Sequence, residues 1–282
     1  MKKILPAKGA LLLVGVVIFS VTGCNKKVGQ LPVTSKLCKV EKITEFFQGF
    51  LYDTISFFYN SYGNPDSIIR QHTGTAVNNY IFRYDAAHRA TDVIGAYGNG
   101  SPSFETWHRL HYKGDKIYSD TLYVFGFLGD VPTKEPGQPY LNTGLLSTFQ
   151  YDVQGRISRT VDWFIGLDST ITYYSYDRQG NLAKTYTTNT AGTVLYSTLY
   201  TGYDDKIDPD RENPIFQFLD RNYSMNNRFT ADRYNEIGLP TAISVNPNFP
   251  APTGYPPFYF VSLYTPITLQ YACQDPGSGK IY

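Results

Sequence analysis

TFQYDVQGRIS, residues 148–158, returns in altered form as YYSYDRQGNLA, residues 173–183. Both copies place Tyr-Asp before two variable residues, a glycine, a polar residue and an aliphatic residue. The aspartate side chain can accept a hydrogen bond from the backbone two residues further on. The glycine can take the positive φ that a bulged hairpin turn requires. The stretch therefore predicts the tip of a β-hairpin.

The same unit recurs along most of the chain. Further copies begin at Tyr59, Tyr84 and Tyr234, and degenerate copies begin at Tyr112 and Tyr203. Aromatic or aliphatic residues precede most of these tyrosines at a spacing of two, which puts both side chains on one face of a strand. The predicted turn glycines are Gly63, Gly155, Gly180 and Gly238, and His88 stands in the glycine position of the Tyr84 copy.

These repeats predict an all-β fold. Each unit holds two strands, so seven units and the chain ends predict an antiparallel hairpin array of roughly 14–17 strands. A sheet of that size curls or splits, so we expect one strongly curled or barrel-like sheet. Asn213 followed by Pro214 and an apolar run predicts one short helix within an insertion at 204–230, because Asn favours the N-cap and Pro the first helical position.

The N-terminus predicts export. Three lysines precede an apolar run at residues 10–21, which has the length of a signal-peptide core and is too short to span a bilayer. The run ends at Val21-Thr22-Gly23-Cys24, which resembles a bacterial lipobox. That resemblance implies cleavage before Cys24 and acylation of its thiol and amine. The alternative is an ordinary signal peptide that has a cysteine near its end.

Three segments follow from this interpretation. Residues 1–23 are the lipoprotein signal peptide, residues 24–35 a lipidated tether, and residues 36–282 a single β domain. Asn25, in place of Asp, favours the outer membrane over the inner membrane by family analogy. Removing three lysines from 25 basic residues leaves 22 against 24 acidic ones, and no basic stripe exists. Nucleic acid is therefore not an expected partner.

The repeat units resemble YD repeats of the RHS type. Their use in tandem behind a lipobox is similar to small envelope lipoproteins that carry such repeats, over residues 52–271 of this chain. The resemblance implies a β-shell fold, although seven units are far fewer than the large relatives use to enclose a hollow. Two copies lack the usual glycine, and the copy at Tyr203 opens into the insertion.

Residues with catalytic or metal-binding potential are few. His108 and His111 have a spacing seen in metal sites, but in a strand this spacing places them on opposite faces. Asp208 opens an acidic run that could suggest calcium, yet the run lacks the glycine and the distal glutamate of a calcium loop. No nucleophile, phosphate or zinc motif occurs in the sequence. We therefore predict no enzyme activity, no cofactor and no metal.

An exposed tryptophan is expected on the strand around residue 107. Trp107 shares a face with Glu105, Arg109 and His111, away from the expected core positions Leu110 and Tyr112. Such a tryptophan could stack on a sugar, and cross-strand packing explains it equally well.

Two long proline-rich connections, 130–142 and 246–258, lie on the rim opposite the repeated turns. Loops gathered on one rim are frequent binding sites, so Tyr140, Phe249, Tyr255 and Phe258 form a candidate ligand rim. The simpler alternative is that both loops only connect strands.

Three functions remain open from the sequence. The first is a lipid-anchored structural or interaction module of the cell envelope with an unidentified protein partner. The second is a glycan-binding lipoprotein that uses the candidate ligand rim. The third, a membrane-spanning barrel, conflicts with the lipid anchor and with the mixed polarity of both strand faces.

Two cysteines remain besides Cys24. Cys38 lies in the expected first strand and Cys273 in the expected last strand, in a chain expected to be exported to a compartment where disulfides persist. We expect them to form a disulfide, with two buried free thiols as the alternative. Such a bridge should bring the two ends of the sheet together and give a closed or nearly closed curl.

Overall fold

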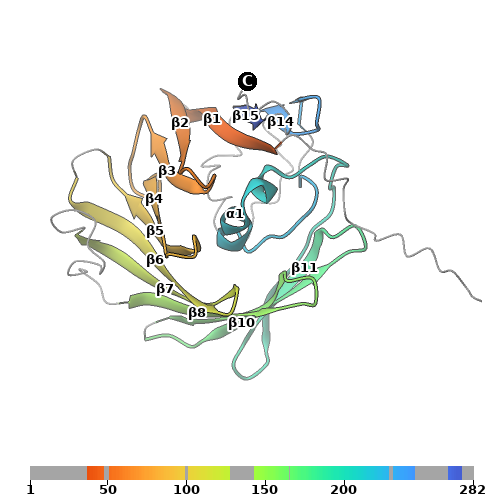
Figure 1. Ribbon diagram of the computed structural model, residues 1–282. Helices are drawn as coiled ribbons and strands as arrows, with labels where there is room; N and C mark the ends of the chain where they lie inside the picture. The colour runs from red at the N-terminus through yellow and green to blue at the C-terminus, as the bar shows by residue number, and fades with distance from the viewer. Residues whose placement is uncertain are drawn as a thin grey trace, which may run out of the picture. The chain divides into compact units, whose positions relative to one another are not determined.

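The computed structural model describes residues 37–47, 51–98, 101–127, 143–164, 166–228, 231–244 and 266–274. These residues belong to one compact unit of the chain, Pro32–Tyr282. They form one antiparallel sheet of 15 strands with two short helical segments (Figure 1). The predicted all-β class and strand number are confirmed. Cys24, the signal peptide and tether, Tyr140, Phe249, Tyr255 and Phe258 lie outside the described residues.

The elements follow the hairpin repeat along the chain. The strands are β1 (Leu37–Phe47), β2 (Leu51–Tyr59), β3 (Pro65–Arg70), β4 (Asn79–Tyr84), β5 (Ala90–Ala96), β6 (Ser103–Lys113), β7 (Lys116–Phe127), β8 (Thr143–Tyr151), β9 (Ile157–Phe164), β10 (Thr170–Tyr176), β11 (Leu182–Asn189), β12 (Val194–Leu199), β13 (Arg233–Tyr234), β14 (Pro240–Ile243) and β15 (Ile267–Gln274). Between β12 and β13 lie a 3₁₀-helix, η1 (Pro209–Glu212), and an α-helix, α1 (Pro214–Leu219).

From β1 to β12, neighbours in the sequence are neighbours in the sheet. The chain then leaves the sheet through η1 and α1. It returns as β13, β14 and β15, and β15 pairs with the free side of β1. Among the described strands, the two edges of the sheet are therefore β12 and β13, the strands that flank the insertion.

This topology corrects the expected consequence of the cysteine pair. Cys38 and Cys273 are directly opposite each other in the β1–β15 ladder and form a disulfide. The bridge does not join the two edges of the sheet, because β1 and β15 are interior neighbours. The prediction that the bridge would bring the two ends of the sheet together is therefore wrong: the last strand docks beside the first, and the edges of the described sheet, β12 and β13, flank the insertion.

Five of the seven repeated turns, those that begin at Asn60, Asp85, Asp152, Asp177 and Asn235, share one backbone hydrogen bond. At Asp152, one carboxylate oxygen accepts the amides of Gln154 and Arg156, both at 2.9 Å, and the Asp152 carbonyl accepts the amide of Gly155 at 3.0 Å. The carbonyl bond recurs at Asn60, Asp85, Asp177 and Asn235, and the ladder shifts register beside each tip. The acidic or amide side chain thus builds the turn that the sequence predicts.

The residue three positions after the turn acid or amide has positive φ. Gly155 has φ +81°, Gly180 +91° and His88 +61°. Gly63 and Gly238 have φ +81° and +88°. Left-handed backbone favours glycine because a Cβ crowds the following carbonyl.

Valine at Gly155 or Gly180 should therefore lower the free energy of unfolding by at least about 1 kcal/mol, the scale of left-handed backbone strain. At Gly180 a new Cβ would also lie 2.8 Å from the Met225 Cγ. Gly74 is the control, because its φ is not left-handed and a Cβ would meet nothing within 4 Å. Urea unfolding of the three variants measures the difference; equal losses at all three sites would contradict this account of the turn.

One sheet face carries the main core. We call the face that packs on α1 the inner face and the opposite one the outer face. Asn213 caps α1 by accepting the Ile215 amide at 3.0 Å, and Pro214 follows it, as predicted. Phe216 is fully buried between Phe57 of β2 and Phe82 of β4. The insertion therefore supplies the apolar residues that cover the inner face.

Candidate functional site

The anchor tyrosines join successive repeats. The Tyr84 hydroxyl donates to the carbonyl of Pro65 at 2.5 Å, and the Tyr176 hydroxyl donates to the carbonyl of Ile157 at 3.0 Å. In each pair the acceptor lies two residues after the turn glycine of the preceding repeat. The same bond joins Tyr112 to Ala90, Tyr151 to Ile117, Tyr203 to Leu182 and Tyr271 to Pro240. A hydroxyl therefore ties each repeat to the one before it.

A basic residue after the turn extends this link. Arg156 pairs with Asp152 of its own turn, with 2.8 Å between Nε and Oδ2, and its guanidinium lies 4.0 Å from the ring centre of Tyr176 in the next repeat. Arg89 likewise pairs with Asp85 and lies over the next anchor tyrosine. The Arg89 amide and guanidinium hold the pKa of Asp85 below its usual range. The repeat side chains are therefore occupied in holding neighbouring turns together.

A cavity of about 270 Å³ opens beside these turns, between the tips of four repeats and the start of α1. The rings of Tyr84, Tyr112, Tyr151 and Tyr223 line it, and Phe218 lies among them. We call this cavity the tyrosine pocket. The hydroxyls of the first three tyrosines are held by backbone carbonyls, so these walls are fixed in place.

Tyr223 differs from the other three tyrosines of the pocket. Its hydroxyl makes no hydrogen bond within the described residues, and burial, with the neighbouring tyrosines, raises the pKa of Tyr223, so that the phenol stays protonated. A neutral phenol can donate one hydrogen bond and accept another. The tyrosine pocket therefore combines aromatic walls with the Tyr223 phenol and with other polar lining residues that could orient a small polar ligand, Asn64, His88, Arg89, Asp115, Lys116 and Asn213.

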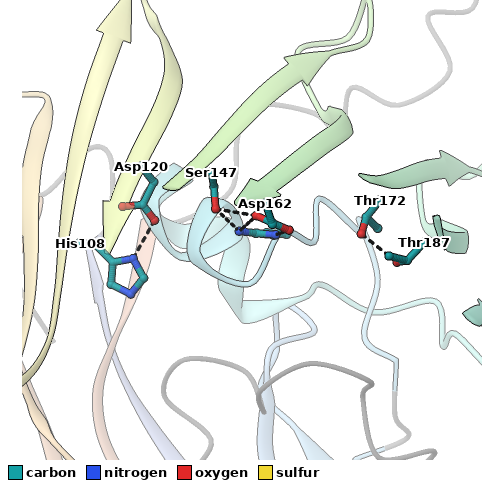
Figure 2. A network of polar contacts seen from close by, with 7 residues as sticks. His108, Asp120, Ser147, Asp162, Thr172 and Thr187 are labelled. Carbon is teal, nitrogen blue, oxygen red and sulfur yellow. Dashed lines mark hydrogen bonds and ion pairs between the residues drawn. The ribbon is translucent and has the colours of Figure 1, made fainter. Parts of the chain in front are cut away.

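A row of polar side chains crosses the inner face, one from each of β6 to β11. Figure 2 shows its members, His108, Asp120, Ser147, Asp162, Thr172 and Thr187. His108 Nδ1 lies 2.7 Å from Asp120, the Ser147 hydroxyl donates to Asp162 at 2.5 Å, and the two threonine hydroxyls are 2.8 Å apart. Polar pairs across strands stabilise a sheet in this way.

Arg221 reaches the row from the end of α1. Its guanidinium donates to both carboxylate oxygens of Asp162, at 2.8 and 2.9 Å, and to the Ser147 hydroxyl at 2.9 Å. Its φ of +50° is left-handed, a conformation that usually favours glycine after a helix. The two-pronged pair with Asp162 offsets this strain and fixes α1 against β9.

The polar row does not form a nucleophilic triad. Such a triad requires a hydrogen bond from the serine to the histidine, whereas the described bonds of Ser147 go to Asp162 and Arg221. His108 pairs with Asp120 on the inner face, while the ring of His111 lies beside Tyr118. Within the described ranges, no group of three or more His, Cys, Asp or Glu side chains is placed to hold a metal ion.

Trp107 lies on the predicted face, away from Leu110, but it is not exposed. Its side chain is fully buried, and its indole N–H donates to Asp92 at 2.8 Å. The guanidinium of Arg83 lies over the ring at 4.8 Å, and the ring packs against Phe104. The connection between β3 and β4 reaches this strand through the Ala76 amide, which donates to Glu105. The interpretation of Trp107 as an exposed sugar-stacking residue is therefore wrong.

The carboxyl group of Glu212 attaches η1 to β1 and β2. One oxygen of Glu212 accepts the amide of Val40 at 2.5 Å, and the other lies 2.6 Å from the Tyr59 hydroxyl. That hydroxyl is also 2.7 Å from the Val40 carbonyl. The Tyr59 hydroxyl has a single proton and two acceptors within reach of it, the Val40 carbonyl and the Glu212 carboxyl. Burial raises the pKa of Glu212 to about 8, against the hydrogen bonds of Tyr59 and Val40, which lower it.

The raised pKa of Glu212 predicts a pH-dependent stability. The folded value of about 8 exceeds the ordinary 4.5, so the contribution is fully present below pH 4.5 and is lost as the pH rises through 8. Glu212→Gln copies the neutral acid, so this variant should lose less stability than the wild type between pH 5 and pH 8. Urea unfolding at both pH values measures it, with the exposed Glu41→Gln as control. An equal loss in Glu212→Gln and the wild type would contradict the neutral carboxyl.

The fold and these contacts define a class: an all-β protein built from hairpin repeats that are joined by tyrosine hydroxyls. No protein-family model matches the chain, and no curated protein matches it. The crystal structure titled TcdB2-TccC3-Cdc42 is a weak structural neighbour, with 14% identity and a TM-score of 0.30 over 59% of this chain and 8% of that chain. The crystal structure titled TcdB2-TccC3 has 13% identity and a TM-score of 0.30, over 73% of this chain and 11% of that one.

Sequence reasoning missed Arg221, which completes the polar row, and Tyr223, which completes the tyrosine pocket. Arg221 and Tyr223 follow α1 in a stretch without a repeat, and nothing in their spacing separates them from loop residues. The links between successive repeats did leave a signal in the sequence: an arginine follows the turn in the copies at Tyr84 and Tyr151.

No helix among the described residues is long and apolar enough to cross a membrane.

Proposed function

We propose that this chain is a lipid-anchored module of the cell envelope, built from RHS-like YD repeats, that acts as a structural or interaction scaffold without catalysis. The observation that carries the proposal is the use of the repeat side chains. The turn acids, the basic residues after the turns and the anchor tyrosines bond to one another along the array. A scaffold needs such internal bonds, and it leaves the connecting loops and the sheet edges for partners.

A strongly curled sheet is part of this proposal. The rings of Phe216 and Phe218 in α1 contact Phe57 of β2 and Phe149 of β8, at centroid distances of 6.4 and 4.8 Å. Six strand steps at about 4.8 Å each separate β2 from β8, roughly 29 Å in a flat sheet. A helix of this length spans only about 9 Å. Contact with both strands supports a sheet that bends around α1.

The anchor is tested at Cys24. Cys24→Ser removes the thiol that a lipobox cysteine needs for acylation, so the variant should lose labelled palmitate and leave the membrane fraction. One acyl chain binds membranes only marginally, and several chains bind them stably. Asn25→Ser, beside the same predicted cleavage site, is the matched control and should retain both label and membrane association. If Cys24→Ser keeps the label, the lipoprotein assignment fails.

The interaction role is tested by cross-linking on intact cells. The wild type should give cross-links to one defined envelope protein that map to the connecting loops, and these should disappear when residues 130–142 are shortened. Cross-links spread evenly over the chain, or none at all, would count against an interaction module.

Glycan binding is the second candidate function, and the tyrosine pocket favours it. Aromatic walls with a free phenol suit a sugar ring, whose faces are apolar and whose hydroxyls pair with polar groups. The sequence places this function instead in the rim residues Tyr140 and Tyr255. A glycan array separates the two sites: Tyr223→Phe should abolish binding at the pocket, and Tyr140→Ala with Tyr255→Ala binding at the rim. An array without hits removes glycan binding and leaves the interaction module.

A further inference from the structure

Strand β12 is an edge of the sheet with unusual composition. It pairs with β11 on one side, and no strand of the described chain lies on its other side. Its six residues, VLYSTL, include no charge and no proline. Natural edge strands are usually blunted by such residues or kept very short. The opposite edge follows this rule, because β13 has only two residues and one of them is Arg233.

Apolar side chains of β12 are also exposed. Leu199 is 70% exposed, Val194 58% and Tyr196 49%. Tyr196 is opposite Thr187 on the inner face, whereas Leu199 is opposite Lys184 on the outer face. On that outer face Tyr186 of β11 stacks on Tyr173 of β10 at 4.7 Å. Exposed apolar side chains gathered in one place mark interaction surfaces. Edge and neighbouring face together therefore form one docking surface.

The side chains of this surface are those of protein interfaces. Tyr173 and Tyr186 lie next to Arg159 and Lys184, whose charged ends are each 5.7 Å from a tyrosine ring centre. Trp163 of β9 is 40% exposed. Tyrosine, tryptophan and arginine dominate the binding energy of protein interfaces. The other tryptophan of the outer face, Trp107, cannot contribute to a docking surface, because its side chain is fully buried.

We infer that β12 pairs with β12 of a second copy of this chain, so that two sheets join edge to edge. In every antiparallel register between two copies of β12, only uncharged side chains oppose each other. A charged partner strand would lose hydration of its charges without finding an ion pair on β12. Pairing of β12 with β13 of another copy would give an open, head-to-tail contact, and the two residues of β13 are too few to sustain it. The symmetric pair is closed, and it pairs the free backbone groups of β12 in both copies.

This dimer goes beyond the proposed envelope function and does not depend on it. Its test is disulfide trapping with Ser197→Cys in the full chain, in intact cells that make it, with the total cell protein analysed. In the register that sets Ser197 of one copy opposite Ser197 of the other, the two Cα atoms should be about 4.5–5.5 Å apart, within the range that a disulfide bridges. The variant should give a covalent dimer on a non-reducing gel. The wild type and Val153→Cys, whose parent side chain is 97% exposed in a turn, are the controls.

The expected excess of dimer over Val153→Cys is more than about tenfold, because pairing raises the effective thiol concentration into the millimolar range. Adding Leu195→Lys and Leu199→Lys to Ser197→Cys should abolish the covalent dimer, because positions 195 and 199 are opposite each other when Ser197 is opposite Ser197, so like charges would face each other across the pair. Circular dichroism checks that this triple variant keeps its strand content. A dimer band no stronger than that of Val153→Cys, a band that survives both lysines, or a cross-link to a different protein would each overturn the inference.

Discussion

Replacing Cys38 and Cys273 together by alanine is expected to lower the free energy of unfolding by about 5 kcal/mol. The disulfide closes a loop of 235 residues, nearly the whole β domain, and so restricts the unfolded chain strongly. The folded state should keep its topology, because the β1–β15 ladder continues from Leu37 to Glu45 beyond the cysteine pair. Thermal or urea unfolding under non-reducing conditions measures the loss.

Two controls separate the cross-link from the side chains. Wild-type protein unfolded in reductant should match the double alanine variant, because both lack the closed loop. Cys38→Ala alone should lose as much as the double variant, since one cysteine cannot form the bridge. Mass spectrometry of the non-reduced protein provides the direct check: two free thiols in the wild type would remove the disulfide and the expected loss.

Arg70→Met is expected to lower the free energy of unfolding by about 3–5 kcal/mol. The guanidinium of Arg70 on β3 lies 3.1 Å from Glu45 of β1 and 3.5 Å from Asp53 of β2, and all three side chains have no exposed surface. Glu45 and Asp53 are directly opposite each other in the β1–β2 ladder. Without the cation, two buried carboxylates would face each other, and one must be protonated for the sheet to form.

The matched control is Arg89→Met, which removes an arginine from the ion pair with Asp85. Arg89 is 41% exposed there, and exposed pairs contribute about 1 kcal/mol or less. The triple variant Glu45→Gln, Asp53→Asn and Arg70→Met should recover most of the loss, because no charge is then left buried. Equal losses in Arg70→Met and Arg89→Met, or no recovery in the triple variant, would show that the buried cation has no special role.

Local chemistry made the hairpin predictable. The turn at Asp152 needs only an acceptor side chain, a glycine with positive φ and alternating residues before it, all within a few positions of one another. Because those interactions join residues close together in the sequence, each copy could be recognised by itself. Counting two strands for each copy then predicted the strand number and the all-β class. The same reasoning placed α1, because Asn213 at the N-cap and Pro214 at the first helical position are enough to mark the start of a helix.

Burial of the outer face was not predictable in this way. The alternation around Trp107 correctly placed it away from Leu110, but it could not show that Arg83 and Phe104 would pack against the ring. Those residues come from other parts of the array and meet Trp107 only after the strands have paired. A strand pattern assigns a side chain to a face, and tertiary contacts decide whether that face is covered.

The sequence by itself determined the repeat, its turns, the strand count and the pairing of each strand with the next. Tertiary structure alone decided where the array ends. The insertion carries apolar residues such as Phe216 onto the inner face, and the chain then returns to place β15 beside β1, so that β12 and β13 become the edges among the described strands. It also brought Arg221 to Asp162 and Tyr223 to the tyrosine pocket. These contacts join residues tens of positions apart or more, and their partners follow from packing, which no short pattern encodes.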